Sequence, residues 1–296
     1  MASQHVTREL HNRRFSVSPL EAGLSAEVTN FPFESYCLDD VDVIKAAWNE
    51  FPVLRFRGST LSDEDQIRFS KEFGPPVVHP AQNAEGAHAS HPEILVISNV
   101  KADDGKPQGA LGDGEVEWHS DTPFVERTPA GAFLRGIVIP ATGGNTEFLS
   151  MYAAYDTLSA ELRKAVEGRC LHHQSIYKAN MVLRSGVTDP GTDDILKWPG
   201  VDHPIVRTHG DTKRKCLYLG FRNYARVVGV PLDESEAIVE ALWHHATNDN
   251  PVWSQLWKPG DLLMWDNRCV MHRRDPFDPL ATRLMHRTTS QGERPA

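Results

Sequence analysis

Residues 259–272 read PGDLLMWDNRCVMH, so that a turn, a short apolar run, a polar segment and a histidine follow one another. Pro259–Asp261 has the composition of a turn. The run Leu262–Trp265 has the length and apolar character of a buried strand, and Asp266–Arg268 then leads to His272. The stretch therefore predicts a core strand that ends beside a polar turn and a histidine.

Short β-rich runs bounded by turn residues recur along the rest of the chain, and together they predict a sheet or a barrel as the core. They are Val53–Arg57, Ile94–Ser98, Ala132–Ile139, Cys216–Gly220, Leu262–Trp265 and Arg283–Thr289. Amphipathic helices are expected to begin near Asp40, Ser62, Ser159 and Asp233, each of which precedes apolar residues at helical spacing. We therefore expect a mainly β fold with flanking helices.

The composition is that of an ordinary globular protein. The chain has 296 residues, 40% hydrophobic and 24% charged, and no internal repeat or Ser/Gly-rich linker, so we expect a single domain over 1–296. The stretch 172–202 has little periodicity and many turn formers, which predicts a lid or insert. The net charge of −9 excludes a globally basic surface for nucleic acid or anionic lipid and favours a small-molecule partner.

Neither export nor membrane insertion is indicated. The first residues form no apolar core of a signal peptide, and no apolar run approaches the ~20 residues that a membrane span needs. The four cysteines are scattered without a C-x-x-C pair, which fits a reducing cytoplasm. The sequence does not decide whether identical chains form an oligomer.

The strongest local signal for chemistry is Trp118–Asp121, WHSD. On a strand, His119 and Asp121 would lie on one face with Cα atoms about 7 Å apart, close enough to share an ion. This pattern alone is common by chance. With His272 it gives two histidines and one carboxylate, the donor set of non-haem Fe(II) oxygenases. A zinc hydrolase with the same ligands, and a solvated loop position for His272, remain open alternatives.

Two arginines follow His272 at spacings of 11 and 15 residues. A strand over this segment puts Arg283, Met285 and Arg287 on one face, with the arginines about 13 Å apart. Two inward guanidinium groups need two anions, because an unpaired buried cation is costly. The anions could be carboxylates of ligands or structural Asp and Glu partners.

At this point the sequence resembles the TauD/TfdA family of Fe(II)- and 2-oxoglutarate-dependent dioxygenases, from about Leu54 to Pro295. No single motif is specific, but the combination is. The matching stretches are Leu54–Gly58, Phe73–Pro75, Ile97–Val100, Trp118–Asp121, Gly143–Phe148, Trp265–Arg268 through His272–Arg273, and Arg283-x-x-x-Arg287.

The resemblance implies a double-stranded β-helix, or jelly-roll barrel, with helices outside. It implies that His119, Asp121 and His272 bind Fe(II), and that Thr146 and Arg283 hold the distal carboxylate of 2-oxoglutarate. The third reactant would be O2, and succinate and CO2 the co-products. The presence of Asp121 implies oxygen transfer, because related halogenases lack this carboxylate.

The resemblance also bears on the substrate, since Arg287 would face its acidic head group. His79 matches the taurine enzymes, whereas Lys101 follows a stretch like that of the phenoxyalkanoate enzymes, in which a lysine reaches the substrate carboxylate. Gln82 stands where the taurine enzymes have tyrosine, so we favour an aryloxyalkanoate or similar carboxylate. For Lys101 a solvated position remains open, and for His79 a position in a turn.

The sequence is also compatible with other substrates and with one other class of protein. Within the same enzyme class, the substrate could be taurine, an alkylsulfonate or an alkyl sulfate. In a different class, the protein could be a non-catalytic sensor that binds a metal and 2-oxoglutarate, although such a sensor would not need Arg287.

Overall fold

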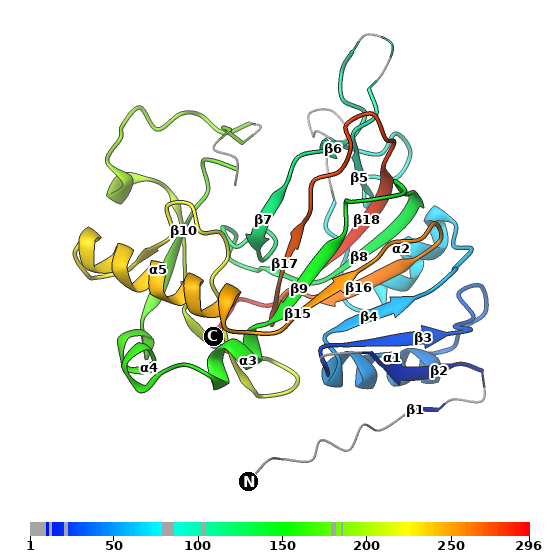
Figure 1. Cartoon of the computed structure of the whole chain (residues 1–296), viewed down its shortest axis with the longest axis horizontal. Coiled ribbons are helices and arrows are strands. Elements are labelled where there is room, and N and C mark those ends of the chain that lie inside the picture. The colour runs from blue at the N-terminus through cyan, green and yellow to red at the C-terminus, as the bar shows by residue number, and fades with distance from the viewer. Residues whose placement is uncertain are drawn as a thin grey trace.

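The computed structural model describes residues 10–11, 14–20, 23–78, 86–101, 103, 105–178, 182–184 and 186–296. Most regular structure in this part is strand, with a few helices at the sides (Figure 1). None of the described helices is both long and apolar enough to span a bilayer.

The described strands form four sheets, of which the largest has nine strands. All neighbours in it are antiparallel except β3 with β4 and β5 with β6. In spatial order its strands are β1 (Leu10–His11), β2 (Ser16–Pro19), β3 (Ser25–Thr29), β4 (Val53–Phe56), β16 (Leu262–Asp266), β8 (Pro129–Val138), β18 (Leu284–Gln291), β5 (Leu95–Ser98) and β6 (Ala110–Leu111).

The second sheet carries the residues that matter for chemistry. Its order is β15 (Val252–Gln255), β9 (Thr146–Ser150), β17 (Val270–Arg274) and β7 (Val116–His119). Two smaller sheets complete the fold: β11 (Gly200–Pro204), β10 (Cys170–Gln174) and β14 (Arg226–Val227) in one, β12 (Val206–Thr208) and β13 (Lys215–Leu217) in the other.

Alternate residues of the central strands face two different hydrophobic cores. Leu262 and Met264 of β16 pack with the N-terminal helices, whereas Leu263 and Trp265 face the four-stranded sheet. The rings of Trp265 and Phe148 meet there with centroids 5.6 Å apart. Since both faces are covered, β16 is a continuous apolar run, as its sequence predicts.

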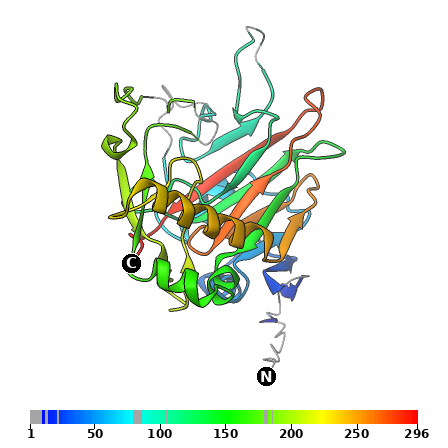
Figure 2. The ribbon, with the colours of Figure 1, turned by 60° about the vertical axis from the view of Figure 1, so that its left-hand side comes forward.

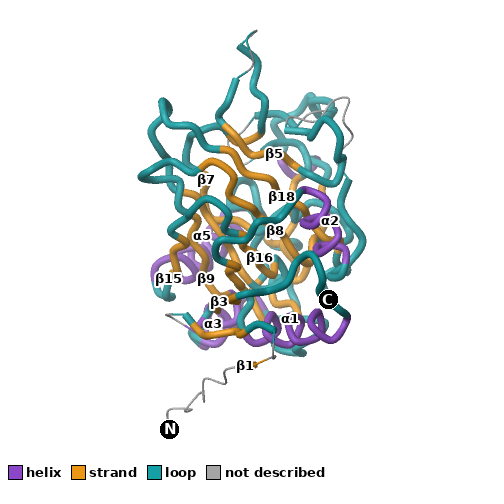
Figure 3. The backbone as a smooth tube through the Cα atoms, turned by 90° about the vertical axis from the view of Figure 1, so that its right-hand side faces the viewer, coloured by secondary structure: helices purple, strands orange, loops and turns teal. Residues whose placement is uncertain are grey.

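The helices lie on opposite sides of the strands (Figure 3). On one side are α1 (Leu38–Glu50) and α2 (Asp63–Lys71). On the other are α3 (Met151–Asp156), α4 (Ala160–Val166) and α5 (Leu232–Asn248), the long helix in front of the smaller sheets in Figure 2. Buried Gln66 fastens α2 to the large sheet, because its Nε2 donates to the carbonyls of Phe133 and His286, each at 3.0 Å.

The helix and strand predictions are largely confirmed, with differences at the ends. Ser62 and Ser159 cap α2 and α4 as expected. Helix α1 begins before Asp40, whose carboxylate instead accepts the Cys37 backbone N–H at 3.0 Å inside the first turn. The short helix α3 was not predicted. In the expected insert 172–202, both ends are strand: β10 and β11 pair from Cys170↔Pro204 to Gln174↔Gly200.

Replacement of Phe69 should destabilise the N-terminal core. Its ring is fully buried, with the centroids of Phe31 and Phe33 5.3 and 5.2 Å away. We expect Phe69→Ala to lower the free energy of unfolding by about 3–5 kcal/mol, because it leaves a cavity. Urea unfolding measures this, with Leu280→Ala at an exposed side chain as the control. A loss below about 1 kcal/mol would contradict the packing described.

Candidate functional site

His119, Asp121 and His272 come together as predicted. His119 ends β7 and pairs in register with His272 of β17. One ligand atom from each of the three side chains lies within 4.8 Å of the other two, and all three residues are buried. The local reason differs from the prediction, because Asp121 lies beyond the end of β7, in the turn that follows, rather than on the strand.

Neighbouring groups orient both imidazole rings. His119 Nδ1 lies 2.7 Å from the Glu117 carbonyl oxygen, to which a protonated Nδ1 donates. This leaves the Nε2 lone pair for a metal. Phe221 stacks on the His119 ring at 5.2 Å, and Trp265 packs against His272 at 4.8 Å. The two Nε2 atoms lie 3.9 and 4.0 Å from the Asp121 carboxylate.

Burial and charge give these groups the protonation states that a metal site requires. Burial lowers the pKa of both His119 and His272, so the rings are neutral. Burial would raise the pKa of Asp121, but the charge of Arg287 and its hydrogen bond to the carboxylate outweigh burial and hold that pKa at about 2. Two neutral imidazoles and one ionised carboxylate fit Fe(II) with coordination positions left open.

A buried ion pair shapes the turn beside Asp121. The Asp266 carboxylate accepts hydrogen bonds from the Arg268 backbone N–H, Nε and Nη2 at 2.7 to 2.9 Å. Between them, Asn267 Oδ1 accepts from Trp265 Nε1 at 3.0 Å and from the Asp121 backbone N–H at 3.5 Å. The turn therefore holds the backbone of a candidate metal ligand.

Arg287 contacts one of the candidate metal ligands directly. Its Nη1 donates to Asp121 Oδ1 at 2.9 Å. The Arg287 guanidinium therefore lies beside the candidate metal centre. Its Nε is buried without a hydrogen-bond partner. The guanidinium can thus hold Asp121 and still donate to a second anion.

Residues of the predicted motifs hold the backbone and the guanidinium of Arg283, and Trp257 contacts Thr146. Ser98 Oγ donates to the Arg283 carbonyl at 2.8 Å, and the Arg283 backbone N–H donates to Asn99 Oδ1 at 3.0 Å. Gly144 has a φ of +65°, and a Cβ there would lie 3.2 Å from Arg283 Nε, so glycine makes room for the guanidinium. Trp257 Nε1 donates to Thr146 Oγ1 at 3.0 Å, which leaves the hydroxyl hydrogen for another acceptor.

Of the other two predicted substrate residues, Lys101 is exposed, and its backbone forms an isolated β-bridge with Pro107. No described contact places Lys101 at the candidate metal ligands. His79 lies outside the described residues, and so does Gln82.

Two arginines near these residues were not predicted. Arg274 shares a strand face with His272, two residues away, and strand parity alone could have identified it. Arg184 comes from the chain between β10 and β11. Its Cζ lies 3.7 Å from the ring centroid of Phe124 and 5.8 Å from that of Phe221, the ring stacked on His119.

Two further clusters bring possible metal ligands together among the described residues, Asp63 with His88 and His286, and His209 with Asp266 and Cys269. In each cluster one histidine, His88 or His209, accepts hydrogen bonds from backbone N–H groups at Nδ1. A ring that accepts at Nδ1 has its hydrogen on Nε2, which faces the carboxylate of Asp63 or Asp266 and is not available as a metal ligand. Arg135 pairs with Asp63 and Arg268 with Asp266, so neither carboxylate is free for a metal.

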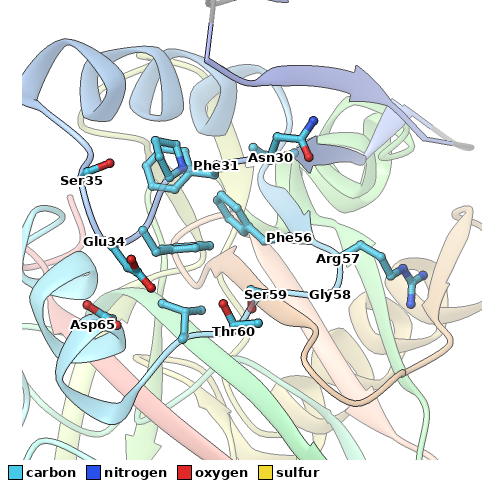
Figure 4. A pocket seen from close by; sticks show the side chains of 14 residues that line it. Asn30, Phe31, Glu34, Ser35, Phe56, Arg57, Gly58, Ser59, Thr60 and Asp65 are labelled. Atoms are coloured by element: carbon cyan, nitrogen blue, oxygen red, sulfur yellow. The ribbon is translucent and has the colours of Figure 1, made fainter.

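A cavity of about 330 Å³ lies elsewhere, between the chain before α1 and the chain before α2. Asn30, Glu34, Ser59 and Asp65 surround Phe31 and Phe56 there (Figure 4). None of the predicted site residues lines it.

Comparison with known proteins gives a consistent result over nearly the whole chain. The family model "Taurine catabolism dioxygenase TauD, TfdA family" matches residues 16–289, which include all the metal-ligand and arginine positions above. The alpha-ketoglutarate-dependent 2,4-dichlorophenoxyacetate dioxygenase of Cupriavidus pinatubonensis is 35% identical over 257 residues, covering 85% of this chain and 88% of that protein.

Solved structures agree. A taurine dioxygenase from Burkholderia xenovorans superposes with a TM-score of 0.75 at 30% identity, covering 96% of this chain and 93% of that one. The crystal structure of AAD-2 in complex with Mn(II) and N-oxalylglycine gives 0.74 at 27% identity, covering 95% of this chain and 98% of that one.

Removal of one imidazole should abolish tight metal binding. We expect His272→Ala to lose stoichiometric binding of Mn(II) in calorimetric titration, because one of three protein ligands is gone. His119→Ala and Asp121→Ala should behave alike. His244→Ala, at an exposed position of α5, is the control and should bind as the parent does. Unchanged Mn(II) affinity in His272→Ala would place the metal elsewhere.

Proposed function

Because the chain belongs to the TauD/TfdA family, whose members include taurine catabolism dioxygenases, we propose that it hydroxylates a small organic acid, with an aryloxyalkanoate or similar carboxylate as the favoured substrate. The chain is an enzyme, a non-haem Fe(II)- and 2-oxoglutarate-dependent dioxygenase. The observation that carries the proposal is the convergence of a buried metal-ligand set with two arginines, the partly buried Arg287 beside the ligands and the buried Arg283 away from them.

His119, Asp121 and His272 are the residues that would hold Fe(II). When bound, the iron and 2-oxoglutarate supply the oxidation of a C–H bond by O2, with succinate and CO2 as co-products. The protein positions the reactants and excludes water. Phe221, Trp265 and the buried environment of the ligands serve this purpose, because they pack against the two imidazole rings.

Arg283 and Thr146 would hold the distal carboxylate of 2-oxoglutarate. Burial, and after it the charge of Arg274, lowers the pKa of Arg283 to about 9, which still leaves it charged at neutral pH. Its Nε is buried without a partner, and the Thr146 hydroxyl has a hydrogen to donate. A carboxylate between these groups would satisfy both.

Arg287 would bind the acidic head group of the primary substrate. It lies against the metal ligand Asp121 and retains an unpartnered Nε, so an anion bound there would bring its neighbouring carbon close to the metal. The preference for an aryloxyalkanoate is supported by the similarity to the 2,4-dichlorophenoxyacetate dioxygenase. Lys101 and His79 remain proposed auxiliaries.

A sulfur-containing acid is the second candidate, favoured by the similarity to a taurine dioxygenase. Arg287 would suit a sulfonate or sulfate as well as a carboxylate. A non-catalytic sensor is disfavoured, because a protein that binds only 2-oxoglutarate has no use for a second guanidinium beside the proposed metal ligands.

We also propose how the sheets and the β10–β11 connection are arranged around this site. The large and the four-stranded sheet, packed face to face through Trp265 and Phe148, would form the two halves of a jelly-roll barrel within one domain. The chain between β10 and β11 would be the lid, since its Arg184 lies over Phe221. Location in the cytoplasm is consistent with the free cysteines.

The substrate class can be tested by succinate formation with Fe(II), O2 and 2-oxoglutarate. The panel contains phenoxyacetates, 2-phenoxypropionates, taurine and alkyl sulfates, with phenoxyacetamide as a neutral match. We expect acids to stimulate turnover and the amide not to. Arg287→Met should raise the KM for the acid about tenfold or more, because a desolvated charge pair is lost, while Arg163→Met on α4 should not.

Two results would contradict this proposal. One is equal oxidation of phenoxyacetamide and phenoxyacetate, and the other is an unchanged KM for the acid in Arg287→Met. Mn(II) binding by the Arg287 variant should be checked in parallel, because the same side chain contacts Asp121.

A further inference from the structure

Arg274 and Arg283 are two buried cations without a carboxylate in contact. The residues are 6% and 2% exposed, and among the described residues no Asp or Glu forms an ion pair with either. Arg274 keeps Nε and Nη1 buried without hydrogen-bond partners, and Arg283 keeps Nε in the same state. Asp113 acts on Arg274 electrostatically, but from beyond ion-pair distance.

The two guanidinium groups lie close together, against the same Phe277 ring. Arg274 is the cross-strand partner of Thr146, so the two residues lie on one face of the four-stranded sheet. The ring centroid of Phe277 lies 5.6 Å from Arg274 Cζ and 5.9 Å from Arg283 Cζ. The two positive charges therefore repel each other. Burial lowers the pKa of Arg283, and the charge of Arg274 lowers it further.

This arrangement is unfavourable unless an anion completes it. A buried guanidinium without an anion loses its hydration and gains little in return, and a second like charge nearby adds repulsion. The aromatic face of Phe277 compensates only in part, because a cation–π contact is weaker than the pairing of a buried guanidinium with an anion.

We propose that Arg274 is a second guanidinium for the distal carboxylate of 2-oxoglutarate, acting with Arg283 and Thr146 to select a dianionic oxoacid. This inference rests on the proposed placement of 2-oxoglutarate. The carboxylate offers two oxygens with about four acceptor positions, enough for both guanidinium groups and the Thr146 hydroxyl. An oxoacid that ends in a methyl group leaves both cations unneutralised, so the site discriminates against it by charge.

A structural role for Arg274 is the competing explanation. Its Nη2 donates to the carbonyls of Leu111, at 3.1 Å, and of Gly114, and so holds the chain between β6 and β7. If this were its whole role, its loss would weaken the binding of every oxoacid alike. An anion-binding role instead affects only those oxoacids with a distal carboxylate.

The test compares 2-oxoglutarate with 2-oxovalerate, which has the same chain length but no distal carboxylate. Affinities are measured by anaerobic calorimetry on the Mn(II)-loaded protein, without turnover. We expect Arg274→Met to weaken 2-oxoglutarate about tenfold to a hundredfold and 2-oxovalerate less than threefold. Arg274→Lys should recover part of the loss. Arg273→Met is the matched control, since Arg273 pairs with Glu147 at 2.5 Å and packs against Trp118.

The outcomes separate this inference from the function on which it rests. If the parent protein binds no 2-oxoglutarate, the proposed function is wrong and this inference falls with it. If Arg283→Met weakens 2-oxoglutarate but Arg274→Met does not, this inference alone is wrong. Equal weakening of both oxoacids in Arg274→Met, with a lower melting temperature of the ligand-free protein, would assign Arg274 the structural role.

Discussion

The buried Asp266 carboxylate is the constraint on which the metal centre depends. Burial opposes its ionisation, but Arg268 and His209 hold its pKa well below the ordinary range. A charged pair so deep is strongly destabilised by loss of either member. In return it fixes the chain between β16 and β17, where Asn267 accepts the backbone N–H of Asp121. One electrostatic anchor thus sets both the strand that bears His272 and the turn that bears Asp121.

Charged side chains are arranged in a definite order across the candidate site. At one end, two neutral imidazoles and a carboxylate face Arg287. At the other, Arg274 and Arg283 are charged, and no Asp or Glu in the described part of the chain contacts either. The end with the proposed metal ligands favours a cation and the arginine end an anion, so a chelating dicarboxylate bound as we propose would be oriented before any reaction begins. Preorganised groups of this kind do not need to rearrange during the chemical step.

Sequence reasoning succeeded where a local pattern determines the outcome. Ser62 caps α2, and the parity of the last strand places Arg287 and His286 on opposite faces, toward Asp121 and Asp63. Sequence reasoning was less successful where contacts between residues far apart in the chain determine the position of a side chain. The pairing of Arg287 with Asp121 joins residues 166 positions apart. Arg274 could have been found by extending strand parity past His272, but that no described Asp or Glu pairs with it is visible only in three dimensions.

The β10–β11 hairpin has a consequence for divergence among related chains. The pairing of β10 with β11 places Gln174 opposite Gly200, so the two ends of the segment between them are fixed by the strands. Insertions and deletions in such a segment cost little, since loop closure depends only weakly on length. Arg184 belongs to this segment, while His119 and His272, two of the proposed metal ligands, belong to the four-stranded sheet. The surface above the metal can therefore change by gain or loss of residues, on an evolutionary timescale, without altering the reaction below it.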